Sequence, residues 1–203
     1  MSFIKKVAAV TAIFAAVTMT ASVAHATPFT NGDFEQQLSG WTYSGNLALA
    51  TPVYFGAGTA TKNGNNMVAF NAGDQPANAV LTQTFDTIAG ATYVVKFGYG
   101  MTNGERSQEL DASVLDSDGT SLASLNAQEY RSGDLETFMF DFIAISSSST
   151  LKFVDNANND SNSLDGMLDN VSVTNVPEPG TISLLALGVL GLGISRRANK
   201  KIS

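Results

Sequence analysis

Hydrophobic and polar residues alternate with a period of two through the middle of the chain. In residues 92–99 every second side chain is aromatic or β-branched, and residues 109–115 and 138–144 repeat the pattern. A strand that buries one face and exposes the other produces this alternation, because successive side chains point to opposite sides. Shorter strand candidates are residues 67–70, 80–85 and 151–153.

Clusters of turn-forming residues separate these segments. Residues 71–74, 86–90, 116–119 and 131–134 each combine glycine with aspartate or asparagine, which tolerate positive φ or bond to their own backbone. Helical periodicity is hard to find between residues 27 and 176. The pattern therefore predicts an all-β fold of eight or nine short strands, an antiparallel β-sandwich of the jelly-roll type.

The N-terminus has the layout of a secretory signal peptide. Two lysines, Lys5 and Lys6, precede an apolar stretch, and Ala24-His25-Ala26 supplies small residues for a cut before Thr27. This layout predicts that residues 1–26 are removed and that the folded part, residues 27–175, is exported.

The C-terminus carries a second hydrophobic segment behind a rigid joint. Two prolines around Glu178 resist helix and sheet, because each ring fixes φ and removes a backbone donor. The uncharged run 181–195 follows and ends at four cations within six residues. Its 15 residues span about 22 Å as a helix, against a hydrocarbon core of about 30 Å. This predicts a short transmembrane helix that suits a transient, processed anchor, with its basic end in the cytoplasm.

The order of these parts resembles the PEP-CTERM sorting signal of Gram-negative bacteria that make extracellular polysaccharide. The matching residues are Val176, Pro177, Glu178, Pro179, the apolar run 181–194, Arg196 and Arg197. The resemblance implies that residues 176–203 are recognised by a membrane protease of the exosortase type. The protein would then stand at the periplasmic face of the inner membrane before processing, and in the cell envelope or outside the cell afterwards. An ordinary C-terminal anchor is the alternative.

Charge and side-chain inventory exclude several function classes. Residues 27–176 hold five cationic and seventeen acidic side chains, a net charge of −12, so nucleic acid and anionic membrane surfaces would repel this part of the chain. The only histidine is His25 and there is no cysteine. Imidazole bases, Ser-His-Asp triads, cysteine nucleophiles and zinc sites built from His or Cys are therefore excluded from the mature domain.

The borders of the domain resemble those of galactose-binding-like jelly rolls, the fold of many carbohydrate-binding modules. The matching segments are residues 31–35, 39–41 and 168–173. The resemblance implies a structural calcium ion between the early loop and the last strand, with Glu35 and Asp169 as ligands. Strand parity adds that Asp169 shares a face with Met167, Val171 and Val173, so its carboxylate needs a partner. The alternative is that Asp169 caps a backbone amide and Glu35 is solvated.

Sugar binding needs exposed aromatic faces with hydrogen-bonding groups nearby. The aromatic candidates are Trp41, Tyr43, Tyr54 and Tyr130, although Trp41 would equally serve as a core anchor. The sequence thus predicts a non-catalytic exported protein of the envelope, extracellular matrix or biofilm that binds polysaccharide. One alternative is a structural matrix or adhesion protein without a defined ligand. The other is a glycosidase using paired carboxylates, such as Glu109 with Asp111 or Asp134 with Glu136.

Overall fold

A computed structural model describes residues 28–50, 66–72, 75–101, 107–130, 135–159 and 165–177. The predicted signal peptide, the predicted membrane helix and Tyr54 lie outside these ranges. Within them no helix is both long and apolar enough to cross a membrane. The strands of these ranges are β1 (Thr42–Ser44), β2 (Leu47–Ala50), β3 (Met67–Phe70), β4 (Val80–Asp86), β5 (Thr92–Met101), β6 (Gln108–Asp116), β7 (Ser121–Glu129), β8 (Glu136–Ile143), β9 (Ser148–Asp155) and β10 (Gly166–Val176).

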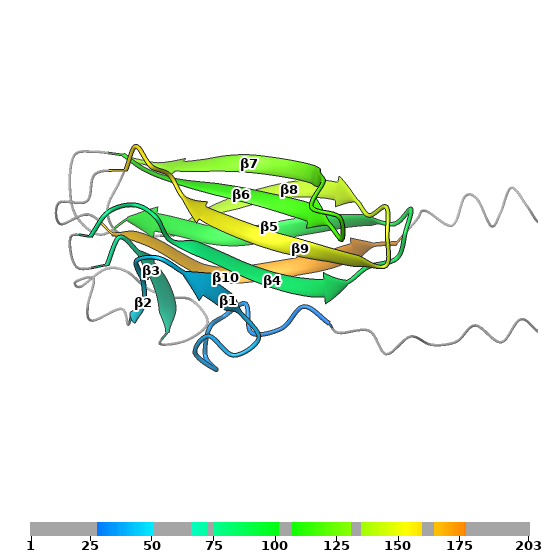
Figure 1. The fold of residues 1–203 in the computed structure, drawn as a ribbon, viewed down its shortest axis with the longest axis horizontal. Coiled ribbons are helices and arrows are strands. Elements are labelled where there is room, and N and C mark those ends of the chain that lie inside the picture. Colours follow the sequence, from blue (N-terminus) through cyan, green and yellow to red (C-terminus); the bar gives the residue numbers. More distant parts are fainter. Residues whose placement is uncertain are drawn as a thin grey trace, which may run out of the picture.

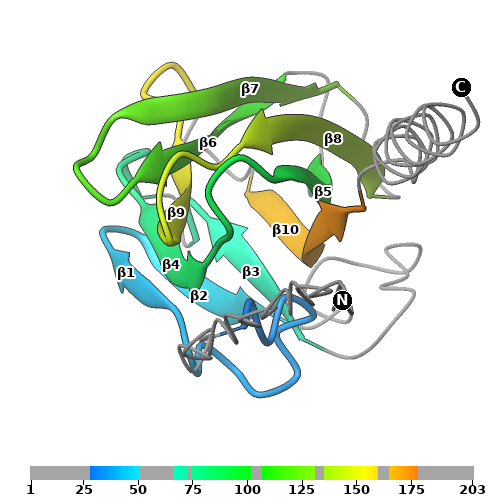
Figure 2. The same ribbon diagram turned by 90° about the vertical axis from the view of Figure 1, so that its right-hand side faces the viewer.

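These strands form two antiparallel sheets that pack face to face (Figures 1 and 2). Sheet A has the order β1-β4-β9-β6-β7, and sheet B has the order β2-β3-β10-β5-β8. Both the all-β class and the predicted antiparallel sandwich are confirmed. The six strand candidates taken from the alternation appear in β3, β4, β5, β6, β8 and β9.

The core forms where the inward faces of the two sheets meet. In β9 the alternate residues Leu151 and Phe153 are fully buried, and Phe97 of sheet B packs edge-on against Phe153 with 5.2 Å between ring centroids. Aromatic contacts of this kind add to the free energy gained by removing apolar area from water. The alternation of hydrophobic and polar residues in the sequence therefore arises because each strand turns one face to this interface.

The loop between residues 28 and 41 closes one side of the core. Phe34 and Trp41 are buried, with ring centroids 5.4 Å apart, and the indole N–H of Trp41 donates to the carbonyl of Asn31. Gly32 lies so close to β10 that a Cβ there would overlap the carbonyl oxygen of Val171. The amide of Val171 also donates to the carbonyl of Gly32, at 2.8 Å. The loop is thus fastened to both the core and β10.

A bulge in β10 overturns the parity predicted for Asp169. Asp169 pairs with Gly98, but Val173 pairs with Val95 because the register shifts between positions 169 and 172. Asn170 takes a φ of 55° at the bulge, a conformation that asparagine tolerates better than most residues. Asp169 therefore faces the outer side of sheet B, whereas Val171 and Val173 face the core, so the three do not share a face.

Candidate binding groove and carboxylate cluster

An open groove of about 990 Å³ lies between the N-terminal loop and the outer side of sheet B. Four segments form it: residues 29–33 of the loop, 96–98 of β5, 135–137 at the start of β8, and 170–173 at the bulge. Gly98 leaves space at the bottom of the groove because it has no side chain. A Cβ at this position would lie 3.2 Å from the Cβ of Leu135. The volume falls within the range of small-molecule binding sites.

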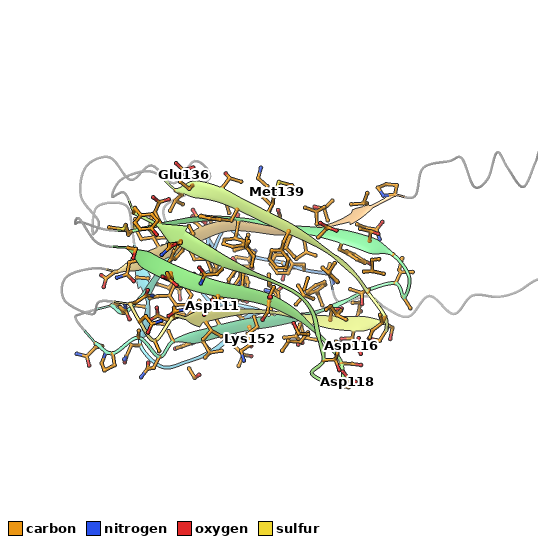
Figure 3. The ribbon with its side chains drawn as sticks, turned by 90° about the horizontal axis from the view of Figure 1, so that it is seen from above. Asp111, Asp116, Asp118, Glu136, Met139 and Lys152 are labelled. Atoms are coloured by element: carbon orange, nitrogen blue, oxygen red, sulfur yellow. The ribbon has the colours of Figure 1, made fainter. Side chains whose placement is uncertain are left out.

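The lining of the groove is rich in hydrogen-bonding groups of both kinds. Lys96 supplies a cation, and Asp33 and Glu136 supply carboxylates. Hydroxyl and amide groups come from Thr30, Thr137, Ser172 and Asn170, beside apolar surface from Leu135. Phe97 and Val171 also border the groove, although their side chains face the core. Figure 3 shows Glu136 on the side of sheet B. Such a surface can exchange hydrogen bonds with a polyhydroxylated molecule while covering its less polar faces.

Next to the groove, one buried carboxylate lies in the field of two others. Asp169 is 1% exposed, and burial, together with the charges of Glu35 and Asp33, raises its pKa to about 7. One oxygen of Asp169 accepts the amide hydrogen of Asn170 at 2.7 Å, which opposes the rise. Glu35 is exposed and accepts a hydrogen bond from the amide of Asn66. Asp169 is therefore a buried carboxylate in a negative field, a setting that a bound cation would relieve.

The oxygen atoms of these carboxylates are of the kind that binds a hard cation, but there are too few of them to complete its coordination. Carboxylate oxygens such as those of Glu35 and Asp169 are ligands that calcium prefers. Within the described residues, however, no three or more Asp, Glu, His or Cys side chains group closely enough to hold a metal ion. A calcium ion at this place would need backbone carbonyl oxygens or water for the remaining positions.

The structure separates the aromatic residues predicted to bind sugar. Trp41 is 7% exposed and packs against Phe29 and Phe153 as well as Phe34, so it matches the alternative in which it anchors the core. Tyr43 and Tyr130 are exposed, at 53% and 61%. Tyr43 lies on β1 and Tyr130 follows β7, at opposite edges of sheet A. Because three strands lie between these edges, the two rings cannot hold one sugar unit together.

The outer face of sheet A carries a hydrogen-bonded row of carboxylates and amides. Asn126 donates to Asp111 at 2.7 Å and to Glu109 at 3.3 Å. Gln128 donates to Glu109, and Asn156 donates to Asp111. Glu109 and Asp111 thus share a face, as the glycosidase alternative requires, but neighbouring amides bind both. Of the other pair, Glu136 lines the groove and Asp134 lies outside the described residues.

A second buried polar group, which the sequence analysis did not single out, lies near the start of β10, at the end of the sandwich opposite Val176. Tyr99 and Asp155 are buried there, and the Tyr99 hydroxyl and one Asp155 oxygen have no hydrogen-bond partner in the described structure. Burial, followed by the charge of Asp155, raises the pKa of Tyr99, and burial raises that of Asp155 to about 6. The alternation of β9 could have revealed Asp155, because it continues the inward parity of Leu151 and Phe153.

Comparison with solved structures places the domain in a class of sandwich folds. The chain is similar to the carbohydrate-binding module TmCBM61, whose structure was determined with β-1,4-galactotriose: the TM-score is 0.54 and the identity 18%, over 73% of this chain and 97% of that one. It is also similar to part of the bacteriophage CBA120 tailspike protein 4 (TM-score 0.51, 14% identity, 73% of this chain). A third similar structure is the arabinose-bound α-L-arabinofuranosidase MgGH51 (TM-score 0.50, 13% identity, 68% of this chain). The chain spans only 21% and 23% of these two longer chains. At such identities the likeness shows the fold, a jelly-roll sandwich of the carbohydrate-binding-module type.

The C-terminal residues match a known sequence motif, which is more specific than the likeness in fold. Residues 175–197 match the PEP-CTERM protein-sorting motif, as the sequence analysis predicted. Only residues 175–177 of the motif belong to the described part of the chain, where β10 ends at Val176. Among curated proteins, no sequence matches the chain significantly.

Proposed function

We propose that this protein is an exported, non-catalytic polysaccharide-binding protein of the cell envelope or extracellular matrix. Its PEP-CTERM motif would hold it at the periplasmic face of the inner membrane until an exosortase-type protease cleaves the tail. The observation that carries the binding half of the proposal is the groove beside the β10 bulge, with its mixed polar and apolar lining. The likeness to a carbohydrate-binding module supports the same proposal.

The chemistry of the groove favours neutral sugars as ligands. Asp33 and Glu136, which line the groove, would accept hydrogen bonds from sugar hydroxyls, and Lys96 would donate to them. A polyanionic chain would meet these two carboxylates and the strongly acidic surface around them, so its approach would be unfavourable.

A glycan microarray with the purified mature protein tests this proposal. Lys96→Ala should weaken binding to the best ligand about tenfold or more, because a hydrogen bond to a charged group is worth about 1.5–3 kcal/mol. Lys152→Ala is the matched control, since Lys152 lies on β9 and points from the outer face of sheet A, opposite the groove (Figure 3). An array without binding, or equal losses for the two lysine variants, would overturn the groove as a sugar site. The first result would favour the structural matrix alternative.

We also propose a structural calcium ion held by Asp169 and Glu35. The raised pKa of Asp169 supports it, because burial beside two other carboxylates makes this position costly for an uncompensated negative charge. A calcium ion supplies the compensating charge when bound. Asp169 and Glu35 would hold it between the first loop and β10, the two ends of the domain.

A glycosidase remains the enzymatic alternative and has its own test. Release of reducing ends from polysaccharide, abolished by Asp111→Asn, would support it. Absence of release with the polysaccharide that binds best would support the non-catalytic proposal.

A further inference from the structure

Large apolar side chains gather at the end of the sandwich from which the C-terminal tail leaves. Ile88, Ile143, Ile145 and Val176 are 67%, 57%, 59% and 41% exposed. They make up half of the exposed large hydrophobic residues within the described ranges. We call these four residues the apolar rim. Single exposed apolar residues are common on protein surfaces, but a group of them marks a surface that is covered in some state of the protein.

Backbone pairing brings the rim residues together. Thr92 of β5 pairs with Ile143 on one side and with Val176 on the other. The amide of Ala144 donates to the carbonyl of Ala91, which fixes the segment 143–145 beside the loop that carries Ile88. Figure 1 shows the ends of β8 and β10 and the loop after β4 at the same end of the molecule. The rim is therefore one surface rather than four unrelated positions.

The side chains of the rim cannot be taken up by the core. Ile143 ends β8 and points away from the interior, because it alternates with the buried Phe142. Ile145 follows the fully buried Ala144 and is itself exposed. At the opposite end of the sandwich, where β7 finishes, Tyr130 is a large exposed residue that carries a polar hydroxyl. At the end that bears the tail, four large apolar side chains are thus exposed to water, and an occupant that covers them would remove this exposure.

The short distance between the rim and the predicted membrane segment of the tail limits which occupant can cover the rim. Five residue steps separate Val176 from Thr181, the first residue of the uncharged run, and five steps reach at most about 18 Å. We propose that the apolar rim rests on the surface of the bilayer in which the tail is inserted, with Ile88 and Ile145 entering the interfacial region. This inference rests on the proposed membrane-bound stage and adds an orientation to it: the domain stands with its rim on the membrane.

Charge and tethering decide which kind of membrane surface fits. Among the described residues, the carboxylates at or near this end are Asp86 on β4, Asp116 at the end of β6, Asp118 in the β6–β7 turn and Asp141 on β8. They would be repelled by anionic lipids, so contact with neutral lipid is favoured. Four apolar side chains bind a bilayer weakly by themselves. A tether this short gives them a high effective concentration at the surface, so weak contacts suffice while the tail is inserted.

Fluorescence quenching by lipid measures this contact directly. The chain contains no cysteine, so Ile88→Cys, Ile145→Cys and Tyr130→Cys each give a single labelling site in the full mature chain. The labelled proteins are reconstituted with their tails into phosphatidylcholine vesicles that contain a lipid with a quencher near the head group. Labels at positions 88 and 145 should be quenched at least about threefold more than the label at 130. Replacing Ile88 and Ile143 by serine should lower the quenching of a label at position 145 towards the value at 130.

Each outcome bears on a different part of the proposal. Equal quenching at the three positions, in protein whose tail resists alkaline extraction, would overturn the rim contact and leave the membrane-bound stage intact. Extraction of the protein by alkali would overturn both. Labels at 88 and 145 that are shielded from aqueous iodide, but not quenched by lipid, would show that a second copy of the chain covers the rim and would overturn the membrane contact. Stronger quenching on addition of phosphatidylglycerol would contradict the charge argument for neutral lipid.

Discussion

Asp169→Asn is the substitution that tests the carboxylate cluster most directly. In the folded protein the pKa of Asp169 is raised from 3.8 to about 7, so the folded state holds this proton more tightly than the unfolded state does. As the pH rises from about 4 to about 7, the unfolded state loses the proton first, and the stability of the calcium-free protein falls. Above pH 7 the loss is complete.

The size of the effect follows from the difference between the two pKa values. A difference of about three units corresponds to about 4 kcal/mol at most. Relaxation of the surrounding polar groups around the ionised carboxylate lowers this to about 2 kcal/mol. Asparagine cannot ionise, yet its side-chain oxygen can still accept the amide hydrogen of Asn170. In calcium-free buffer the variant should therefore gain about 2 kcal/mol relative to the wild type between pH 4 and pH 8.

Calcium should make the wild type more stable than Asp169→Asn. A bound ion favours the ionised carboxylate, so at about one hundred times the dissociation constant it should stabilise the wild type by about 2.7 kcal/mol. Asp169→Asn should show little of this gain, and Glu35→Gln a reduced one. Urea unfolding at each pH, with and without calcium, measures both effects, and Asp141→Asn, which changes an exposed carboxylate on β8, is the control. Identical pH profiles for the wild type and Asp169→Asn would refute the electrostatic reasoning, and identical unfolding curves with and without calcium would refute the ion.

Three further changes test the core, the loop and the tail. Trp41→Ala should cost about 3–5 kcal/mol in urea unfolding, because it empties a buried aromatic site, whereas the exposed Tyr130→Ala should change stability by less than about 0.5 kcal/mol. Gly32→Ala should cost about 1–3 kcal/mol and weaken glycan binding, since its Cβ would overlap the Val171 carbonyl and displace the loop from the groove; unchanged stability would contradict the close approach. Replacing Pro177–Pro179 by alanines should leave the tail uncleaved, which intact-mass measurement of the protein from cells with the protease would reveal.

The fold was predictable from the sequence because most strands bury one face. In β4, β6 and β9 the burial alternates residue by residue, and in β5 it does so as far as Phe97. Such strands leave their period in the sequence. Strand β7 was missed, since its small and polar residues at an edge of sheet A carry little contrast between the two faces. The short strands β1 and β2 were also missed: β1 is exposed throughout and β2 buries only Ala50, whereas the equally short β3 is fully buried.

The candidate site was less predictable than the fold because it depends on a local irregularity. Asn170 adds a residue to β10 and turns Asp169 to the outer side of sheet B, and no alternation rule anticipates a bulge. The pairing of the first loop with the last strand, which brings Asp33 and Glu35 near Asp169, came from the resemblance and not from the pattern. The groove itself depends on Gly98, and a pattern of hydrophobic and polar residues does not show that a glycine leaves space for a ligand.

The position of β10 has a mechanical consequence. The tail continues directly from β10, which lies in the middle of sheet B and is bonded to β3 on one side and β5 on the other. Antiparallel hydrogen bonds run perpendicular to the strands, so a pull along the tail loads many of them together in shear instead of opening them one at a time. A protein held by its tail at one surface and by a polymer at another would resist such tension through its central strand, and its lifetime under load would follow the rate of unfolding.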